Sequence, residues 1–548
     1  MEGLSVESSS MWERTYEKRI EKIVEGWLEK PELGWLIDFN KLLPEAEIYL
    51  VGGCLRDAGL DKECQDLDFI VRKIESPILE KTLSSLGQVV LVGKNFGVFK
   101  FRPQGYEDFE FDLALPRTDS AFGTGGYKDV ETQSDPDLPI ETDLARRDFT
   151  VNALAYNLKS KKLLDPYHGL KDLKEKTIQT VGEPKERFQE DYSRLLRALR
   201  FATSIDGKIS TKTSEVLKDF LPRLNERKNK VTGEVILDQV RQVLPNDWEY
   251  ILPGELVASE IVKTLTSNPV KFWDLYQEYE VWSLFVPDFT HMKSCEQTSK
   301  YHAEGNVANH MRLVLSGTQE KLFKNILENE KILAEVLVAA LFHDVSKPST
   351  HQLTSTGHHF YGHEQVGAKL WSDLQKILPF ATTGLDTVMV QKLIGNHMQI
   401  NDNVYEMRKE TILKYFGGET GRNQLLLGVL DVGACWRGRF KRQDFSKIKF
   451  ILGELEKMIQ EGYILPAEKL KSKKPLINGQ EIMRLWNLSG NDKDKCHWIG
   501  WLKAAAWEAE LAGDFKDKKI ESFDERELQK IITNYLTSEQ RKLYNNLF

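Results

Sequence analysis

The stretch Tyr49-Leu-Val-Gly-Gly-Cys-Leu-Arg-Asp-Ala-Gly59, followed by Asp66-Leu-Asp-Phe-Ile-Val71, decides the fold of this chain. An apolar run that ends at two glycines predicts a buried strand and a tight turn into a helix, where bare backbone N–H groups can approach a phosphate. Asp66 and Asp68 stand two apart on the next predicted strand, so their carboxylates should share one face. Such a pair favours Mg²⁺ that bridges the carboxylates to substrate phosphates.

Further short runs predict the rest of one small sheet: QVVLVG at 88–93, GVFKF at 97–101 and FEFDLAL at 109–115. Alternation in the last run places Glu110 and Asp112 opposite the phenylalanines, so Asp112 is a third carboxylate candidate. Residues 1–45 are predicted to be helical, and beyond about residue 150 helical periodicity dominates. The architecture is thus a small sheet-and-helix head followed by a long, mostly helical remainder.

Composition excludes several classes of protein. The 548 residues suggest three or four domains. No run reaches the roughly 18 apolar residues of a membrane span, and no secretory pattern opens the chain. Five cysteines without a CxxC motif favour a reducing cytoplasm over a disulfide framework. The net charge is −8, but residues 141–230 hold 20 basic and 14 acidic residues, and 437–474 is also basic, as in a selective polyanion binder.

The order of motifs resembles the polymerase β-like nucleotidyltransferases, and more narrowly the bacterial-type tRNA nucleotidyltransferases (CCA-adding enzymes) and the bacterial poly(A) polymerases. After the Gly-Gly and DxD elements, Arg146–Ala153 resembles the ribose and triphosphate motif of these enzymes. Asp165–Leu173 resembles their hinge, and Glu190–Phe201 resembles their base-selecting helix. The resemblance implies an α+β fold, with a nucleotidyltransferase head followed by a helical neck, an HD region and a tail.

The resemblance also implies roles for individual residues. Mg²⁺ held by Asp66 and Asp68, with Asp112, would promote attack of an RNA 3′-hydroxyl on the α-phosphate. The triphosphate and ribose would be bound by residues from the Gly-Gly turn and the second motif: Gly52, Gly53, Arg56, Arg147, Asp148 and Asn152. The alternative for the second motif is a capping or salt-bridge role at a helix start.

The base would be selected by Asp191 and Arg194, which stand three apart on a predicted helix and therefore share a face. Cytosine and adenine both present an amine beside an unprotonated ring nitrogen, so a carboxylate and a guanidinium accept them and reject uracil and guanine. Arg197 and Arg200 extend the positive face. The alternative is a simple helical salt bridge.

A Gly-rich polar stretch at 117–129 is predicted to be a mobile loop. The family resemblance implies that such a loop helps the pocket to switch from C to A. Its presence favours addition of CCA, or of A, over addition of CC alone. A connector without a role is the alternative.

Most of the 11 histidines lie between His302 and His397. His343-Asp344 on an apolar helix, with His310 and Asp431 on others, is the arrangement of a divalent metal site. This set resembles an HD-domain phosphohydrolase, and the resemblance implies a divalent transition metal bound by His310, His343, Asp344 and Asp431, with His363 and His397 nearby. Such a domain can be an active phosphatase or phosphodiesterase, or a scaffold.

The predicted domains are an N-terminal helical extension (1–45), the head (46–160), a neck for base and RNA recognition (161–290), the HD domain (291–440) and a tRNA-binding tail (441–548). The expected partners are the tRNA 3′ end, CTP and ATP, with no membrane and an unassigned oligomeric state. Two alternatives stay open: an A-adding enzyme or poly(A) polymerase, and an HD phosphohydrolase whose head only binds RNA.

Overall fold

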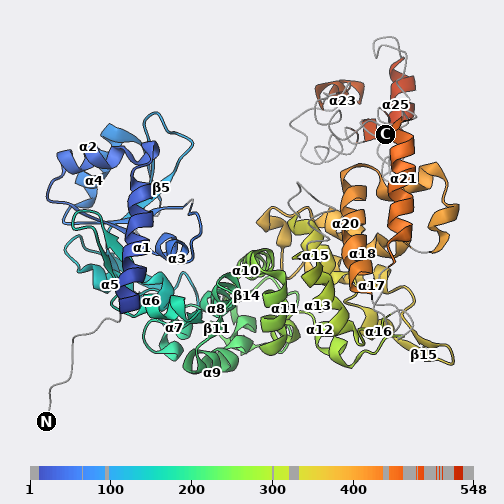
Figure 1. The fold of residues 1–548 in the computed structure, drawn as a ribbon, viewed down its shortest axis with the longest axis horizontal. Helices are drawn as coiled ribbons and strands as arrows, with labels where there is room; N and C mark the ends of the chain where they lie inside the picture. Colours follow the sequence, from blue (N-terminus) through green and yellow to red (C-terminus); the bar gives the residue numbers. More distant parts are fainter. Residues whose placement is uncertain are drawn as a thin grey trace. The chain divides into compact units, whose positions relative to one another are not determined.

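The computed structural model describes two compact units of the chain, Met1–His397 with Leu430–Gln443, and Met398–Val429 with Asp444–Phe548. Within these units the structure describes residues 11–64, 66–92, 98–298, 302–319, 333–400, 402–435, 444–460, 477, 479–486, 502, 505–506, 509 and 524–534. Figure 1 shows the head in blue, the neck in green and the HD helices in yellow to orange.

The head is built on one seven-stranded mixed sheet in the order β3-β4-β5-β2-β1-β8-β9. Its strands are β3 (Gly87–Val92), β4 (Val98–Pro103), β5 (Phe111–Ala114), β2 (Asp68–Arg72), β1 (Glu47–Val51), β8 (Ala155–Asn157) and β9 (Lys162–Leu164). All five predicted runs are strands of this sheet, so that prediction is confirmed. The three-residue strands β8 and β9 were not predicted. Because β2 begins at Asp68, Asp66 lies in the preceding loop, and the prediction that both carboxylates stand on the strand is wrong for Asp66.

Four helices accompany the sheet: α1 (Met11–Leu28), α2 (Trp35–Leu42), α3 (Gly53–Gly59) and α4 (Ser76–Leu86). The helical prediction for the N-terminal region is confirmed by α1 and α2. Ile20 and Trp35 are buried in the same core as the strand residue Phe101, and the rings of Trp35 and Phe101 are 4.9 Å apart. The N-terminal helices are therefore part of the head core.

The Gly-rich stretch forms a hairpin of β6 (Arg117–Ala121) and β7 (Val130–Ser134). Its turn is fixed to the neck, because Gly125 N donates to Gln189 O at 3.0 Å and Tyr192 N donates to Gly125 O at 2.9 Å. The flanks of the predicted loop are therefore paired strands, and its mobility stays a prediction.

The neck is mostly helical, as predicted. It contains α6 (Gly169–Lys174), α7 (Pro184–Glu190), α8 (Ser193–Ser204), α9 (Thr211–Phe220), α10 (Gly254–Ser267), α11 (Pro269–Glu278) and α12 (Asp288–His291). The helix α5 (Ile140–Ala145) belongs to the head, because Ile140 and Leu144 are buried in one core with the β1 residue Val51. Two small sheets were not predicted. One is the parallel pair β10 (Thr177–Ile178) and β11 (Lys208–Ile209), and the other is β13 (Val235–Leu237), β12 (Glu226–Asn229) and β14 (Trp248–Tyr250).

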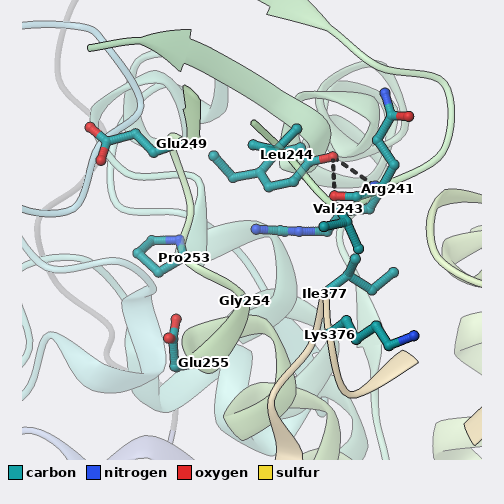
Figure 2. A pocket seen from close by; sticks show the side chains of 11 residues that line it. Arg241, Val243, Leu244, Glu249, Pro253, Gly254, Glu255, Lys376 and Ile377 are labelled. Carbon is teal, nitrogen blue, oxygen red and sulfur yellow. Dashed lines mark hydrogen bonds between the residues drawn. The ribbon is translucent and has the colours of Figure 1, made fainter. Parts of the chain in front are cut away.

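A pocket in the neck lies beside Arg241, Pro253 and Ile377 (Figure 2). Arg241 is 3% exposed, stacks on the Tyr250 ring at 4.0 Å and donates Nη2 to Leu252 O at 2.5 Å. None of the predicted site residues lines this pocket. We therefore assign Arg241 a structural role, in which the carbonyl oxygens of Leu224 and Leu252 accept from the Nη1 and Nη2 groups of a buried guanidinium.

The HD helices of the first unit are α13 (Val307–Gly317), α15 (Ala334–Phe342), α16 (Lys347–Thr350), α17 (His363–Leu374), α18 (Thr387–Asn396) and the end of α20 (Gly418–Ala434). A hairpin of β15 (Gln352–Thr354) and β16 (Gly357–His359) lies between α16 and α17. The core is aromatic: Trp282 stacks on Phe289 at 4.4 Å, and Phe342 contacts Trp371 at 5.1 Å.

The second unit contains α19 (Lys409–Phe416), α21 (Ser446–Gln460), α23 (Gly479–Leu485) and α25 (Glu525–Thr533), besides most of α20. The predicted helices of the tail are confirmed where these elements lie. Most of the basic segment 437–474, apart from 444–460, lies outside the described residues, so its predicted tRNA contacts stay a prediction. No helix among the described residues has the length and apolar character needed to cross a membrane.

Candidate active site and metal centre

Two predicted carboxylates meet on neighbouring strands of the head sheet. Strands β2 and β5 run parallel with Asp68 opposite Asp112, and Asp68 is also opposite Val51, the last residue of β1 before the Gly-Gly turn. Although Asp68 as a whole residue is exposed, its carboxylate has lost part of its surrounding water. This loss, together with the charge of Asp112, raises the pKa of Asp68 from 3.8 to about 6. A site with this surplus of negative charge fits a divalent cation.

The Gly-Gly turn brings Arg147 to this carboxylate pair. Gly52 has φ +80°, and a Cβ built on it would lie 2.6 Å from Arg147 Nη1, so only glycine fits here. Arg147 Nη1 also donates to Asn152 O at 3.3 Å, while its buried Nε has no hydrogen-bond partner among the described atoms. The charge of Arg147 opposes the rise in the Asp68 pKa, so the guanidinium lies within electrostatic reach of this candidate carboxylate.

A chain of hydrogen bonds joins the remaining residues of the predicted triphosphate and ribose site. Arg56 Nη1 donates to Asn152 Oδ1 at 2.8 Å, and Asn152 Nδ2 donates to Asp148 Oδ1 at 3.0 Å. Arg197 Nη2 then donates to Asp148 Oδ2 at 2.5 Å. Burial opposes the charge of Asp148, but Arg197 and Asn152 outweigh it and lower the pKa to about 2. In this structure Asp148 forms a salt bridge with Arg197, as in the alternative interpretation of the second motif. A contact between Asp148 and a ribose stays a prediction.

The predicted base-selecting pair is arranged differently from the prediction. Asp191 is extended and precedes α8, and its Oδ1 accepts a hydrogen bond from Ser193 N at 2.8 Å. Arg194 stands in the first turn of α8 and pairs with Glu190 Oε2 at 2.5 Å. The prediction that both residues lie on one helix is therefore wrong, although the turn keeps them close in the chain. Arg200, predicted to face phosphates, pairs with Glu260 of α10 at 2.7 Å.

Asp143 is a residue of this site that the sequence did not reveal. It is fully buried on α5, and its carboxylate accepts from Arg146 Nη2 at 2.7 Å and from Arg147 Nη2 at 3.4 Å. It therefore helps to set the direction of the Arg147 guanidinium. Its only sequence signal is the spacing of three and four residues to two arginines, which is common on helices.

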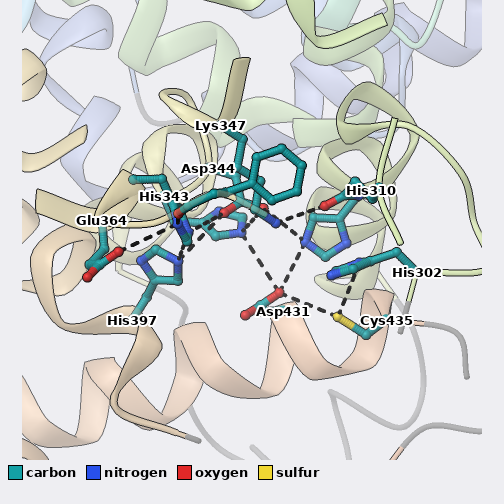
Figure 3. Close-up of polar contacts among 12 residues, drawn as sticks. His302, His310, His343, Asp344, Lys347, Glu364, His397, Asp431 and Cys435 are labelled. Atoms are coloured by element: carbon teal, nitrogen blue, oxygen red, sulfur yellow. Dashed lines mark hydrogen bonds and ion pairs between the residues drawn. The ribbon is translucent and has the colours of Figure 1, made fainter. Parts of the chain in front are cut away.

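The predicted HD residues come together in two adjacent groups of potential ligands (Figure 3). The first group is His310, His343 and Asp431, with His310 Nε2 3.1 Å from Asp431 Oδ1. The second is Asp344, His363 and His397, with His363 Nε2 3.2 Å from Asp344 Oδ1. Asp344 Oδ2 lies 3.5 Å from His310 Nε2, so this carboxylate faces both groups.

The histidine rings are oriented by the backbone. The Nδ1 atoms of His343, His363 and His397 lie 2.9, 2.7 and 2.8 Å from the carbonyl oxygens of Ala340, Phe360 and Ile394. Since a carbonyl only accepts, each Nδ1 carries the proton and each Nε2 presents a lone pair to the centre. Glu304, which sequence reasoning did not select, accepts from His310 Nδ1 at 3.1 Å in the same way. Such outer hydrogen bonds are typical of metal-binding histidines.

The charges of the HD site are compensated within the protein. Lys347 Nζ lies 2.7 Å from Asp344 Oδ2, and the two are nearly completely buried. Burial opposes the charge of His310, but Asp431 and Glu304 raise its pKa to about 9. Burial also opposes the charge of Asp344, yet His343 and Lys347 hold its pKa well below the usual range. The Nε2 atoms of His310 and His343 are buried without a hydrogen-bond partner among the described atoms, which fits a bound cation.

Comparisons with known proteins agree with these two sites. A family model described as the poly A polymerase head domain matches residues 48–179, and an HD domain model matches residues 307–426. Both families generally use divalent metal ions. The multifunctional CCA protein of Pasteurella multocida is 31% identical over 413 residues, which cover 74% of this chain and 87% of that relative. The same protein of Shewanella frigidimarina is 29% identical over 450 residues, which cover 80% and 96%.

A solved CCA-adding enzyme, in an apo form, has the same fold. It is 18% identical, covers 94% of this chain and 99% of its own, and superposes with a TM-score of 0.50. The predicted family and fold class are therefore confirmed. The chain belongs to the multifunctional CCA protein family and is a nucleotidyltransferase with a poly(A) polymerase-type head and an HD domain.

Proposed function

We propose that this cytoplasmic enzyme adds C, C and A, taken from CTP and ATP, to the 3′ end of tRNA and releases pyrophosphate. The observation that supports this most is the placement of Asp68 and Asp112 on adjacent strands, next to the Gly52 turn and Arg147. Membership of the multifunctional CCA protein family favours tRNA as the acceptor over a poly(A) tail or addition of A alone.

In this proposal Asp66, Asp68 and Asp112 hold Mg²⁺, which when bound neutralises phosphate charge and acidifies the attacking 3′-hydroxyl. Gly52 and Gly53 add no side chain of their own to the turn, so the guanidinium groups of Arg147 and Arg56 can lie directly against it. Arg147 and Arg56 bind its oxygens, and each guanidinium is already oriented, Arg147 by Asp143 and Arg56 by Asn152. Preorganised charges of this kind stabilise the transition state without reorganisation during the reaction.

Base selection is proposed for Asp191 and Arg194. Arg194 is held by Glu190 and by the carbonyl oxygens of Arg187 and Arg146, at 3.2 and 3.3 Å. Asp191 is held by the N–H of Ser193. Two side chains fixed by their own neighbours can offer a constant acceptor and donor to each incoming base, which a template would otherwise supply.

A second activity is proposed for the HD domain, a metal-dependent hydrolysis of phosphoesters. His310, His343, Asp344 and Asp431 would hold a divalent transition metal, which when bound supplies an activated water. The specific observation that favours this is the pair of buried Nε2 atoms of His310 and His343, which have no hydrogen-bond partner among the described atoms. Replacing His343 and Asp344 by alanine together should abolish hydrolysis of 2′,3′-cyclic phosphates and spare nucleotide addition.

The test is extension of three tRNA substrates, ending at the discriminator base, at CC and at CCA, with each nucleoside triphosphate alone and with all four. Growth to CCA followed by a stop supports the proposal. Extension of the CC-ended tRNA alone would assign an A-adding enzyme, and unlimited A tails would assign a poly(A) polymerase. Absence of all extension would contradict a catalytic head and leave the HD domain as the only candidate for activity.

A further inference from the structure

Cys435 is a potential ligand of the HD site that the predicted set does not contain. It stands four residues after Asp431, at the end of α20, and its N–H donates to Asp431 O at 3.1 Å. Residues four apart on a helix project from the same side. Accordingly, Cys435 Sγ lies 3.8 Å from Asp431 Oδ1 and 3.9 Å from His302 Nδ1 (Figure 3).

Cys435 belongs to a different group of potential ligands from His343 and Asp431, and Asp431 Oδ1, 3.8 Å from its Sγ, connects the two groups. Its Sγ forms a group with His302, Glu304 and His310, in which all potential ligand atoms lie within 4.8 Å of one another. His310 also belongs to the group with His343 and Asp431. Tetrahedral bonds of about 2.0–2.3 Å to nitrogen, oxygen and sulfur place neighbouring ligand atoms about 3.3–3.8 Å apart. The separations of 3.8 Å from Sγ to Asp431 Oδ1 and 3.1 Å from there to His310 Nε2 are close to this range.

An independent observation indicates that an ion belongs beside this thiol. The side chains of His310 and His343 are completely buried, and their Nε2 atoms lie 3.1 and 3.9 Å from Asp431 Oδ1. Asp344 Oδ2 also lies 3.5 and 3.4 Å from these two atoms, but none of these carboxylate contacts has hydrogen-bond geometry. Buried polar atoms left in this state are costly, and a cation at Asp431 would satisfy both.

We propose that the Cys435 thiolate is a fourth protein ligand of the ion held by His310, His343 and Asp431, and that it makes this site select Zn²⁺, Co²⁺ or Ni²⁺ over Mg²⁺ and Mn²⁺. The proposal rests on the proposed HD metal site. A sulfur–metal bond replaces the S–H bond, and the proton leaves to solvent. Thiolate ligands favour the softer ions, whereas a site of carboxylates alone suits Mg²⁺ and Mn²⁺.

His302 is placed to support the thiolate. Its Nδ1 lies 2.7 Å from Glu304 Oε1, which only accepts, so this nitrogen carries the proton. The same Nδ1 lies 3.9 Å from Cys435 Sγ, so His302 contacts both Glu304 and the sulfur.

The experiment loads the full chain, stripped with a chelator, with Co²⁺ and measures both the bound metal and the absorption spectrum. The expected result is bound Co²⁺ with a thiolate-to-cobalt charge-transfer band in the near ultraviolet. Bound Co²⁺ without that band would overturn the role of Cys435 but leave the metal site standing. No binding of Co²⁺ would overturn both the metal site and the role of Cys435.

Two matched variants identify the sulfur. Cys435→Ser should lose the band, whereas Cys295→Ser, which changes a buried cysteine outside the ligand groups, should keep it. Circular dichroism checks that both variants fold. In competition between Zn²⁺ and Mn²⁺, Cys435→Ser should lose at least about tenfold of the Zn²⁺ preference, a loss typical even of outer contacts to metal ligands. A band or a Zn²⁺ preference that persists in Cys435→Ser would overturn the proposal.

Discussion

The head and the HD domain both gather acidic side chains, but they treat the charge in opposite ways. In the head, Asp68 and Asp112 repel each other, and the pKa of Asp68 is raised to about 6. In the HD domain, Lys347 and the histidines surround Asp344 and hold the pKa of this carboxylate well below its usual range. The head thus keeps a surplus of negative charge, although Lys100 Nζ lies 3.5 Å from Asp112 Oδ1, whereas Asp344 of the HD domain is paired with Lys347.

The elements that supply the potential ligands also differ between the head and the HD domain. Asp68 and Asp112 stand on two neighbouring strands and are reachable by solvent. The HD side chains come from α13, from the ends of α15 and α18, from the start of α17 and from α20, and most are buried. Removal of a carboxylate should therefore abolish chemistry without loss of stability in the head, and should reduce stability in the HD domain.

The largest effect is expected for Asp68→Ala. Nucleotide addition should fall by about a thousandfold or more, equivalent to about 4 kcal/mol in the barrier, because the cation loses a principal ligand. The Tm should stay the same or rise slightly, since repulsion with Asp112 is removed. Single-turnover extension of tRNA and thermal unfolding measure the two effects.

The matched control is Glu110→Gln. Glu110 lies two residues before Asp112, and its Oε2 accepts from Arg102 Nη2 at 2.7 Å, so it is a structural carboxylate. Nucleotide addition should be retained in this variant. Equal loss of activity in both variants would contradict the assignment of Asp68 as a metal ligand.

The next largest effect is expected for Asp344→Ala, which leaves the buried Lys347 ammonium without its carboxylate. Breaking a buried pair from one side costs about 3–5 kcal/mol, so the unfolding transition that includes the HD domain should move to clearly lower temperature. Addition by the head should continue at temperatures where the chain stays folded. Asp373→Ala, at an exposed pair with Lys376, should leave unfolding unchanged; equal shifts would refute the contrast between the sites.

A smaller effect is expected for Asp191→Ala, which removes one of the two proposed base contacts. Discrimination of CTP over UTP and of ATP over GTP, measured as ratios of kcat/KM, should fall about 10- to 100-fold. Overall stability should hardly change, because the side chain makes only a local bond to Ser193 N. Asp219→Ala, an exposed carboxylate on α9, is the control, and undiminished rejection of UTP would disprove the pairing.

Gly125→Ala tests the contact between the hairpin turn and the neck. A Cβ on Gly125 would lie 2.2 Å from the Tyr192 ring, whereas a Cβ on Gly123 would find only Gln189 Nε2, at 3.7 Å. Both glycines have positive φ, so both variants bear similar backbone strain, on the order of 1 kcal/mol. Only Gly125→Ala should displace the turn from Tyr192 and lower the addition rate several-fold. Equal rates in the two variants would show that this contact does not matter.

The sequence predicted those features of the head that have a local pattern. Alternating apolar runs predicted five strands, and the Gly-Gly turn predicted the close approach of the backbone. Strands β8 and β9, of three residues each, are too short for periodicity. The hairpin of β6 and β7 is mostly polar, and its turn is bonded to Gln189 and Tyr192, which lie far along the chain.

For the site residues, the missed features were those that depend on distant packing. Asp191 precedes Tyr192, the N-cap of α8, and its side chain closes a local turn by accepting from Ser193 N, which helical periodicity does not predict. The buried acids Asp143 and Glu304 and the thiol of Cys435 carry no motif. Their roles come from neighbours on other elements, such as His302 and His310 around Glu304.

The smallest expected effect is a pH dependence that separates the two kinds of carboxylate within the head itself. The folded-state pKa of Asp68 is about 6, above its ordinary 3.8, so the folded chain binds a proton there that the unfolded chain has already lost. The destabilisation by the Asp68 charge is therefore full above about pH 6 and fades as the pH falls towards 3.8. In chelator, Asp68→Asn should raise the Tm at about pH 7.5 and do so less at about pH 5.

The charge of Glu110 has the opposite effect on stability, because Lys100 and Arg102 lower the pKa of this carboxylate. Glu110→Gln should therefore lower the Tm at neutral pH and have less effect in acid. Excess Mg²⁺ should shrink the Asp68→Asn difference, since a bound cation relieves the same repulsion. A difference that grows in acid, or that ignores Mg²⁺, would contradict a repulsive carboxylate pair at the cation site.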